Sequence, residues 1–210
     1  LEKLANKLVV VYVNGKPIAE PWIEDNIDVI IEAWEPGSFG GQAVGEIIFG
    51  NVNPSGKLPL TFPRSVGQLQ MVYNHKPSQY FHKYSQEKIT PLYSFGHGLS
   101  YSEFVYSNLE VKKSTIKDST INISFTLTNK SEYEGEEVVQ LYFRDSYSSV
   151  TRPVKELLDY KRISMKPNES KQKQHTKSYM CPSIGLPNLA ANWSCTHIRY
   201  RRRTVNQVSA

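Results

Sequence analysis

Short apolar runs and turn-forming residues alternate along the first forty residues. Residues 8–13 form a continuous run of mostly β-branched apolar side chains, which is typical of a strand buried on both faces of a parallel sheet. Residues 14–17 end this run with turn chemistry. The next apolar side chains recur at helical spacing, yet residues 29–34 also fit a second buried strand that ends at Pro36 and Gly37. Periodicity alone leaves both interpretations open.

A clearer helix pattern follows the pair of glycines at 40 and 41. Four apolar side chains fall on one helical face, and Gly50 provides a C-terminal stop; the four are Ala43, Val44, Ile47 and Ile48. Strand, turn, helix, strand, loop and helix in this order predict an α/β layer. Residues 51–98 are proline-punctuated and predict loops and short extended pieces, with a turn at residues 53–57.

The pattern changes from about Tyr101 onward. Residues 121–128 alternate strictly between apolar and polar side chains, which predicts a half-buried antiparallel strand. Residues 139–143 repeat the alternation after a turn around Gly135, and a third apolar stretch at 157–165 ends at a turn over 166–169. These spacings predict a β-sandwich of immunoglobulin-like type, with a domain boundary between residues 98 and 104.

The last segment has a different composition. Residues 172–210 contain no acidic residue, both cysteines (Cys181 and Cys195), a run of three arginines and no sustained alternation. A reading-frame shift just after Lys171 accounts for all of these changes together. We therefore expect an incomplete sandwich over residues 101–171, lacking its closing strands, and an atypical, poorly ordered basic tail over residues 172–210.

The net charge of +5 comes from this tail. Residues 171–210 hold seven of the 25 basic side chains and none of the 20 acidic ones, so the first 170 residues are slightly acidic. A nearly neutral body gives no support for a nucleic-acid partner. The longest apolar run is too short to span a bilayer, and no signal peptide is visible. Because Leu1 is not a start residue, the chain reads as if it opens within a longer protein.

No catalytic, substrate-binding or metal-binding set emerges from the residue types. Five clustered carboxylates fit either an acid/base pair or a solvated face: Glu24, Asp25, Asp28, Glu32 and Glu35. His75, His82 and His97 lack zinc-ligand spacing, no G-x-S-x-G motif occurs, and the body has no cysteine nucleophile. We predict no cofactor and no metal.

Three further features have both a functional and a structural interpretation. The glycine-rich residues 36–41 before a helix fit an anion cradle or a tight loop that needs a positive φ. The many aromatic residues between 73 and 106 fit stacking on sugars or packing of loops onto a core. Asn-x-Ser sequons begin at Asn122, Asn129, Asn168 and Asn192 and matter only in a eukaryotic secretory setting.

Several longer strings resemble glycoside hydrolase family 3. They are WEPGSFGGQA at 34–43, FGNVNPSGKLPLTFP at 49–63, YNHKP at 73–77 and YSFGHGLSY at 93–101. EVVQLY at 137–142 and SVTRPVKEL at 149–157 resemble the fibronectin type III-like domain appended to that family. The ordered motifs cover roughly residues 8–171 and are together highly specific.

The resemblance implies a retaining exo-hydrolase of β-glucosidase or β-xylosidase type, which cleaves by two-carboxylate double displacement. In that family a barrel carries an Asp nucleophile and the α/β sandwich carries a Glu acid/base upstream of residues 8–13. No acidic residue here matches either motif, so the expected set of catalytic residues is empty.

The expected architecture is an α/β fragment, part of an α/β sandwich with its connecting segment, over residues 1–100. An all-β immunoglobulin or fibronectin type III-like sandwich over residues 101–171 follows it. The parent enzyme would act on a β-linked oligosaccharide or glycoside, and the family layout favours a periplasmic or secreted location. A stand-alone carbohydrate-binding or interaction module built on the β-sandwich is the alternative.

Overall fold

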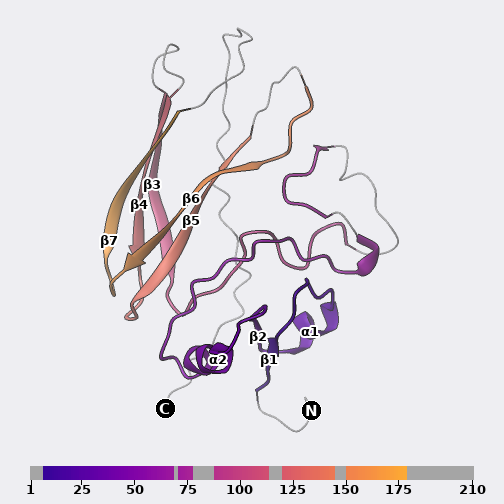
Figure 1. Ribbon diagram of the computed structural model, residues 1–210. Coiled ribbons are helices and arrows are strands. Elements are labelled where there is room, and N and C mark those ends of the chain that lie inside the picture. The colour runs from indigo at the N-terminus through magenta and orange to yellow at the C-terminus, as the bar shows by residue number, and fades with distance from the viewer. Residues whose placement is uncertain (1–6, 69–70, 78–87, 114–119, 145–149, 179–210) are drawn as a thin grey trace.

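The computed structural model describes residues 7–68, 71–77, 88–113, 120–144 and 150–178. A small α/β layer comes first along the chain, and two antiparallel sheets come last (Figure 1). Extended segments between them run alongside each other near the middle of the molecule. The described residues thus contain more sheet than helix, in the α/β-then-β order that the sequence predicts.

The α/β layer is built on two parallel strands. β1 (Val9–Tyr12) pairs with β2 (Val29–Glu32) in register from Val9↔Val29 to Tyr12↔Glu32. The helix between them, α1 (Pro21–Asn26), has six residues, so the strand interpretation of residues 29–34 is correct for Val29–Glu32. α2 (Gly40–Ile48) follows, and Gly50 just beyond it has a φ of 77°, as expected for a helix stop.

The expectation that residues 8–13 are buried on both faces is wrong. Val9 is 42% exposed and Val13 is 65% exposed. A parallel sheet is buried on both faces only when other layers cover it. Within the part of the chain that the structure describes, this sheet has two strands, so its β-branched side chains remain partly open to solvent.

A small buried cluster connects the layer to the rest of the chain. Phe62 and Tyr93 form an isolated antiparallel bridge, and both Phe62 and Leu92 are buried. The 3₁₀ turn η1 (Val66–Gln68) follows this segment. The described residues between 51 and 98, namely 51–68, 71–77 and 88–98, therefore adopt short extended pieces and turns, as their prolines predict.

The two antiparallel sheets enclose the main core. One sheet has the order β3-β4-β7 and consists of β3 (Phe104–Lys113), β4 (Thr120–Asn129) and β7 (Ser170–Ser178). The other pairs β5 (Gly135–Phe143) with β6 (Glu156–Met165). The core takes side chains from both sheets: Ile123, Phe125, Leu127, Val139, Ile163 and Met165. These burials confirm the alternation predicted for β4 and β5, and Ile163 and Met165 place the predicted apolar stretch at 157–165 against the same core.

Strand β3 was not predicted, and its geometry explains the omission. Its pairing with β4 shifts register between Ser107 and Glu110, and Asn108 there has a φ of 52°. A bulge adds a residue and reverses which side chains face the core, so the sequence alternation is broken.

The prediction that the alternating strands stop at Lys171 is wrong. β7 continues to Ser178 and pairs with β4 over nine consecutive residue pairs. Its sequence, SKQKQHTKS, lacks apolar alternation because it is an edge strand held by the backbone ladder, and lysines are common on such edges. The change in composition therefore does not coincide with the end of the sheet. The remainder of the predicted tail, residues 179–210, lies outside the described residues.

No helix in the described ranges is both long enough and apolar enough to span a membrane.

Candidate functional site at the strand ends and the domain junction

The carboxyl ends of β1 and β2 bring three polar or aromatic residues together. The Trp34 amide N donates to Glu32 Oε1 at 3.1 Å, and Asn14 Nδ2 donates to the same oxygen at 3.4 Å. The Asn14 amide N donates in turn to the Trp34 carbonyl at 3.0 Å. Carboxyl ends of parallel strands are where open α/β sheets bind ligands, so this edge is the first candidate site.

Trp34 has a backbone conformation that is unusual for its type. Its φ is 54°, in the left-handed region that bulky residues rarely adopt. Such strain persists only where the surroundings impose it, and it is concentrated at functional sites. Here the Glu32 carboxylate holds the backbone of Trp34, while the indole packs edge-on against Phe62 at a centroid distance of 5.9 Å.

Glu32 differs from the other four clustered carboxylates. Its Oε2 is buried and has no hydrogen-bond partner, and burial raises the pKa of this carboxyl group, although the hydrogen bonds from Trp34 and Asn14 counteract the shift. Asp25, Asp28 and Glu35 are exposed, as a solvated face requires. The cluster is thus mostly solvated. Glu32 is the member that binds the carboxyl end of the strands, while Asp28 accepts from the Leu8 amide N at their opposite end, at 3.1 Å.

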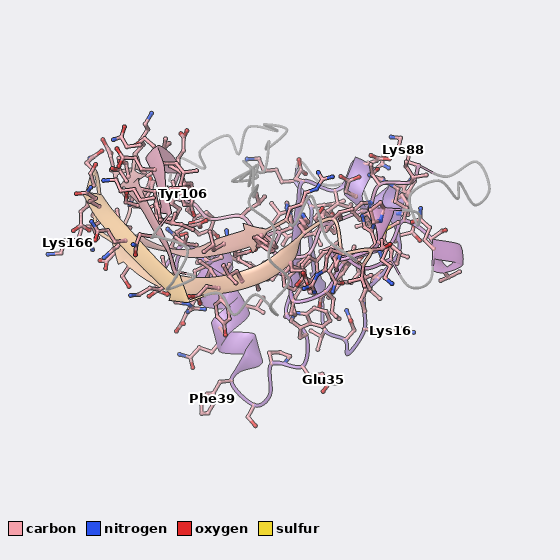
Figure 2. The ribbon with its side chains drawn as sticks, turned by 90° about the horizontal axis from the view of Figure 1, so that it is seen from above. Lys16, Glu35, Phe39, Lys88, Tyr106 and Lys166 are labelled. Atoms are coloured by element: carbon pink, nitrogen blue, oxygen red, sulfur yellow. The ribbon has the colours of Figure 1, made fainter. Side chains whose placement is uncertain are left out.

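The loop after Trp34 projects from the α/β layer. Figure 2 shows Glu35 and Phe39 at the outer side of the molecule, and Phe39 is 78% exposed. Gly37 has a φ of 68°, which supports the structural interpretation of this loop as a tight junction before α2.

A row of rings leads from Trp34 toward the second domain. We call Trp34, Phe62, Tyr93 and His97 the aromatic row. Phe62 and Tyr93 meet edge-on at 6.0 Å, and Tyr93 stacks on His97 at 5.3 Å between centroids. Burial raises the pKa of Tyr93 to about 12, and burial together with the charge of Lys57 lowers the pKa of His97. These shifts favour the uncharged form of both groups in the folded protein.

Asn53 joins the two domains with its side-chain amide. Nδ2 donates to Ser102 Oγ and to the Glu134 carbonyl, both at 2.9 Å. Oδ1 accepts from Ser100 Oγ at 2.8 Å and from the Tyr101 amide N at 2.9 Å. Both amide hydrogens and both acceptor positions are therefore used, which fixes the side chain between the connecting segment and the turn before β5.

Gly135, the first residue of β5, allows this close approach. A Cβ at this position would lie 2.7 Å from Asn53 Nδ2 and 2.8 Å from Ser102 Oγ. Any side chain here would displace the amide that connects the two domains.

Lys57 makes the second connection across the junction. Its Nζ lies 3.2 Å from Glu137 Oε2 on β5 and donates to the Gly98 carbonyl at 2.8 Å. The Lys57 and Glu137 side chains are only 9% and 13% exposed. Removing either partner would leave the other charge poorly solvated, which is why such pairs are sensitive to substitution.

A second aromatic cluster confirms the packing interpretation for part of the aromatic-rich segment. Tyr73 stacks on Phe95 at 4.2 Å and meets Tyr142 edge-on at 6.0 Å. Lys155 Nζ lies 5.1 Å from the centre of the Tyr142 ring, and burial raises the pKa of Tyr142 to about 12. The loop that contains Tyr73 is thereby fastened to β5. Tyr80, Phe81 and Tyr84 lie outside the described residues.

The structure brings together few of the other residues considered from sequence. No cluster of three or more potential metal ligands occurs among the described residues, and His82 is not one of these. His75 Nδ1 lies 2.9 Å from the Lys76 carbonyl. The sequon residue Asn129 is 0% exposed and donates both amide hydrogens to backbone carbonyls. In the folded chain its side chain is therefore not accessible for N-glycosylation.

The junction residues Asn53 and Lys57 carry no functional signal in the sequence. Residues 53–57 were predicted as a turn, and their composition indicates nothing more. The partners of Asn53 lie 47 to 81 residues further along the chain. A local pattern carries no signal for contacts at that separation.

Each of the two domains matches a known protein family. Residues 1–101 match the glycosyl hydrolase family 3 C-terminal domain, and residues 137–176 match a fibronectin type III-like domain. The second match continues past Lys171, in agreement with β7. The chain is 40% identical over 182 residues to a periplasmic β-glucosidase of Salmonella typhimurium, covering 81% of this chain and 24% of that protein. It is 41% identical over 179 residues to a β-xylosidase of Formosa agariphila, and this match covers 81% of this chain and 24% of that protein.

Solved structures show the same relationship. A β-glucosidase from Erythrobacter marinus superposes with a TM-score of 0.77 at 39% identity, covering 81% of this chain and 23% of that one. A β-glucosidase from Listeria innocua gives a TM-score of 0.77 at 30% identity, and the match covers 84% of this chain and 26% of that one. This chain spans about a quarter of the length of the relatives it matches. It belongs to glycoside hydrolase family 3, in which it corresponds to the C-terminal domain followed by the fibronectin type III-like domain.

Proposed function

We propose that this chain is the C-terminal supporting part of a retaining β-glycosidase that removes terminal β-linked glucosyl or xylosyl residues. The matches to named β-glucosidases and β-xylosidases support the substrate class. The observation that carries the supporting role is the interlocked junction, in which Asn53 and Lys57 of the first domain bind the start of β5. The second domain is thereby fixed to the first rather than tethered to it.

In this proposal the chain itself contributes no catalytic carboxylate. Retaining hydrolysis requires a nucleophile and an acid/base carboxyl group about 5 Å apart. Glu32 is the clustered carboxylate that binds the carboxyl end of the strands, and its Oε1 is already engaged by Trp34 and Asn14. We assign it to holding this strand end, together with the loop that follows it.

The proposed second domain is a fibronectin type III-like sandwich of immunoglobulin type. The order β3-β4-β7 facing β5-β6, with a core drawn from both sheets, supports this assignment. Packed aromatic residues around Tyr73 and Tyr93 weigh against the alternative of a stand-alone sugar-binding module, since these rings contact each other.

Hydrolysis of aryl β-glucosides and β-xylosides by the purified chain tests the proposal. We expect no turnover above background, because loss of the reacting carboxylates removes many orders of magnitude in rate. Sequencing upstream of Leu1 provides the complementary test, with an in-frame barrel carrying an Asp motif as the expected result.

Turnover that persists in a pure preparation would overturn the supporting role. The candidates for a catalytic carboxylate would then be Glu35, which is exposed, and Glu87 and Asp145, which lie outside the described residues. A native start codon at Leu1 would instead favour the stand-alone module.

A further inference from the structure

The aromatic row runs from the carboxyl end of β2 to the junction between the domains, and so connects the two places. Trp34 lies at the carboxyl end of β2, while Lys57 and Glu137 lie where β5 meets the first domain. Each step between these points is a direct contact. A change on β5 therefore has a continuous packed route to the strand end.

The first step is the buried ion pair. Lys57 Nζ contacts Glu137 Oε2 at 3.2 Å and the Gly98 carbonyl at 2.8 Å, so one ammonium group holds β5 and the connecting segment together. Tyr106 Oη donates to Glu137 Oε1 at 3.1 Å, which orients the carboxylate from β3 of the other sheet. Glu137 is thus fixed from two sides.

The second step is a backbone ladder that extends the junction toward the rings. The Leu58 amide N donates to the His97 carbonyl at 2.7 Å, and the Gly96 amide N donates to the Leu58 carbonyl at 2.8 Å. Further along the same two segments, the Phe62 amide N donates to the Tyr93 carbonyl at 2.8 Å. Backbone hydrogen bonds therefore join the segment that begins at Lys57 to the segment of Tyr93 and His97, from Leu58 as far as Phe62.

The third step is the packing of Trp34 on Phe62. Phe62 is 3% exposed and contacts both the indole of Trp34 and the ring of Tyr93. A buried ring held on several sides has little room to move independently. Because Trp34 has a strained backbone, its conformation depends on such support as well as on Glu32.

We propose that the fibronectin type III-like domain positions Trp34, and with it the loop that follows β2, through the Lys57–Glu137 pair and the aromatic row. Glu137 is in this view a positioning residue for a strand end in the other domain. The inference deepens the supporting role proposed above and rests on it.

Fluorine NMR of the full chain labelled with 5-fluorotryptophan tests the coupling in the native state. The chain has three tryptophans, so single Trp→Phe variants assign the signals. We expect Glu137→Gln to shift or broaden the Trp34 signal while leaving that of Trp22, which is 55% exposed on α1, unchanged.

Glu136→Gln is the matched control. Glu136 is the adjacent residue on β5, but its ion pair with Arg162 is exposed, at 39% and 59% for the two side chains. Exposed pairs contribute little, so this variant should leave both tryptophan signals in place. Equal effects of Glu136→Gln and Glu137→Gln on Trp34, or no effect of Glu137→Gln, would overturn the proposal.

A double-variant cycle tests the route itself. In a Phe62→Leu background, the effect of Glu137→Gln on the Trp34 signal should disappear or fall to a small fraction of its original size. An undiminished effect would show that the aromatic row does not carry the coupling.

A milder perturbation covers the case in which Glu137→Gln does not fold. Gln140 Nε2 donates to the Gly96 carbonyl at 3.1 Å, so Gln140→Ala removes a neutral contact from the same strand to the same ladder. It also removes the hydrogen bond that Tyr142 Oη donates to Gln140 Oε1, within β5 itself. It should shift the Trp34 signal, and an unmoved signal would refute the coupling. None of these experiments measures hydrolysis, so their failure leaves the β-glycosidase assignment untouched.

Discussion

Replacing Asn129 by alanine should destabilise the chain strongly, although the residue is polar and lies at the end of β4. Asn129 is 0% exposed. Its Nδ2 donates to the Tyr133 and Lys166 carbonyls at 2.8 and 3.1 Å, and its Oδ1 accepts from the Ser131 amide N at 3.0 Å. The side chain thus connects the turn after β4 to the turn after β6.

The free-energy cost of Asn129→Ala depends on which hydrogen-bonding groups keep a partner after the substitution. The Tyr133 carbonyl also accepts from Ser102 Oγ at 3.0 Å, and the Lys166 carbonyl also accepts from the Glu169 amide N at 3.2 Å. Three hydrogen bonds are lost, but these two acceptors keep a partner. At about 1 kcal/mol for each bond, with more where the Ser131 amide loses its acceptor, we expect a cost of about 2–4 kcal/mol.

Urea unfolding followed by circular dichroism measures this cost. The midpoint should fall while the slope with denaturant stays constant, because the surface exposed on unfolding is unchanged. Asn122→Ala is the matched control, since Asn122 lies exposed on the same strand and should change the free energy of unfolding by no more than about 0.5 kcal/mol. Equal losses from the two variants would refute the hydrogen-bond argument.

Three further predictions use the same unfolding assay. Phe125→Ala should cost about 3–5 kcal/mol because Phe125 is in the core, whereas Thr126→Ala should stay near about 0.5 kcal/mol; equal costs would contradict the alternation of β4. Gly135→Ala should destabilise by about 1–3 kcal/mol through overpacking, whereas Gly45→Ala, with open space at its Cβ in α2, should stabilise by about 0.5–1 kcal/mol. Because the pKa of His97 is lowered from 6.5, the unfolded state takes up a proton first, so stability should fall as pH falls below 6.5. His97→Gln should weaken that dependence, and an unchanged pH profile would exclude His97 as its source.

The sequence by itself determined the elements whose residues carry a regular pattern. The period-two alternation predicted β4 and β5, and the glycine stop predicted the end of α2. These predictions succeed because a half-buried element must place apolar side chains at fixed intervals. The ordered motifs also indicated the family, since they depend on residue identity rather than on contacts.

The tertiary structure decided whatever depends on a partner distant in sequence. β7 has no apolar alternation and becomes a strand because β4 supplies the backbone hydrogen bonds along its whole length. The bulge in β3 breaks the pattern from which a strand would be predicted. Asn53 and Lys57 read as part of a turn, yet they join the domains because folding brings Glu134 and Glu137 beside them. Contacts across some 80 residues leave no local trace, so only the folded chain shows where its two domains are joined.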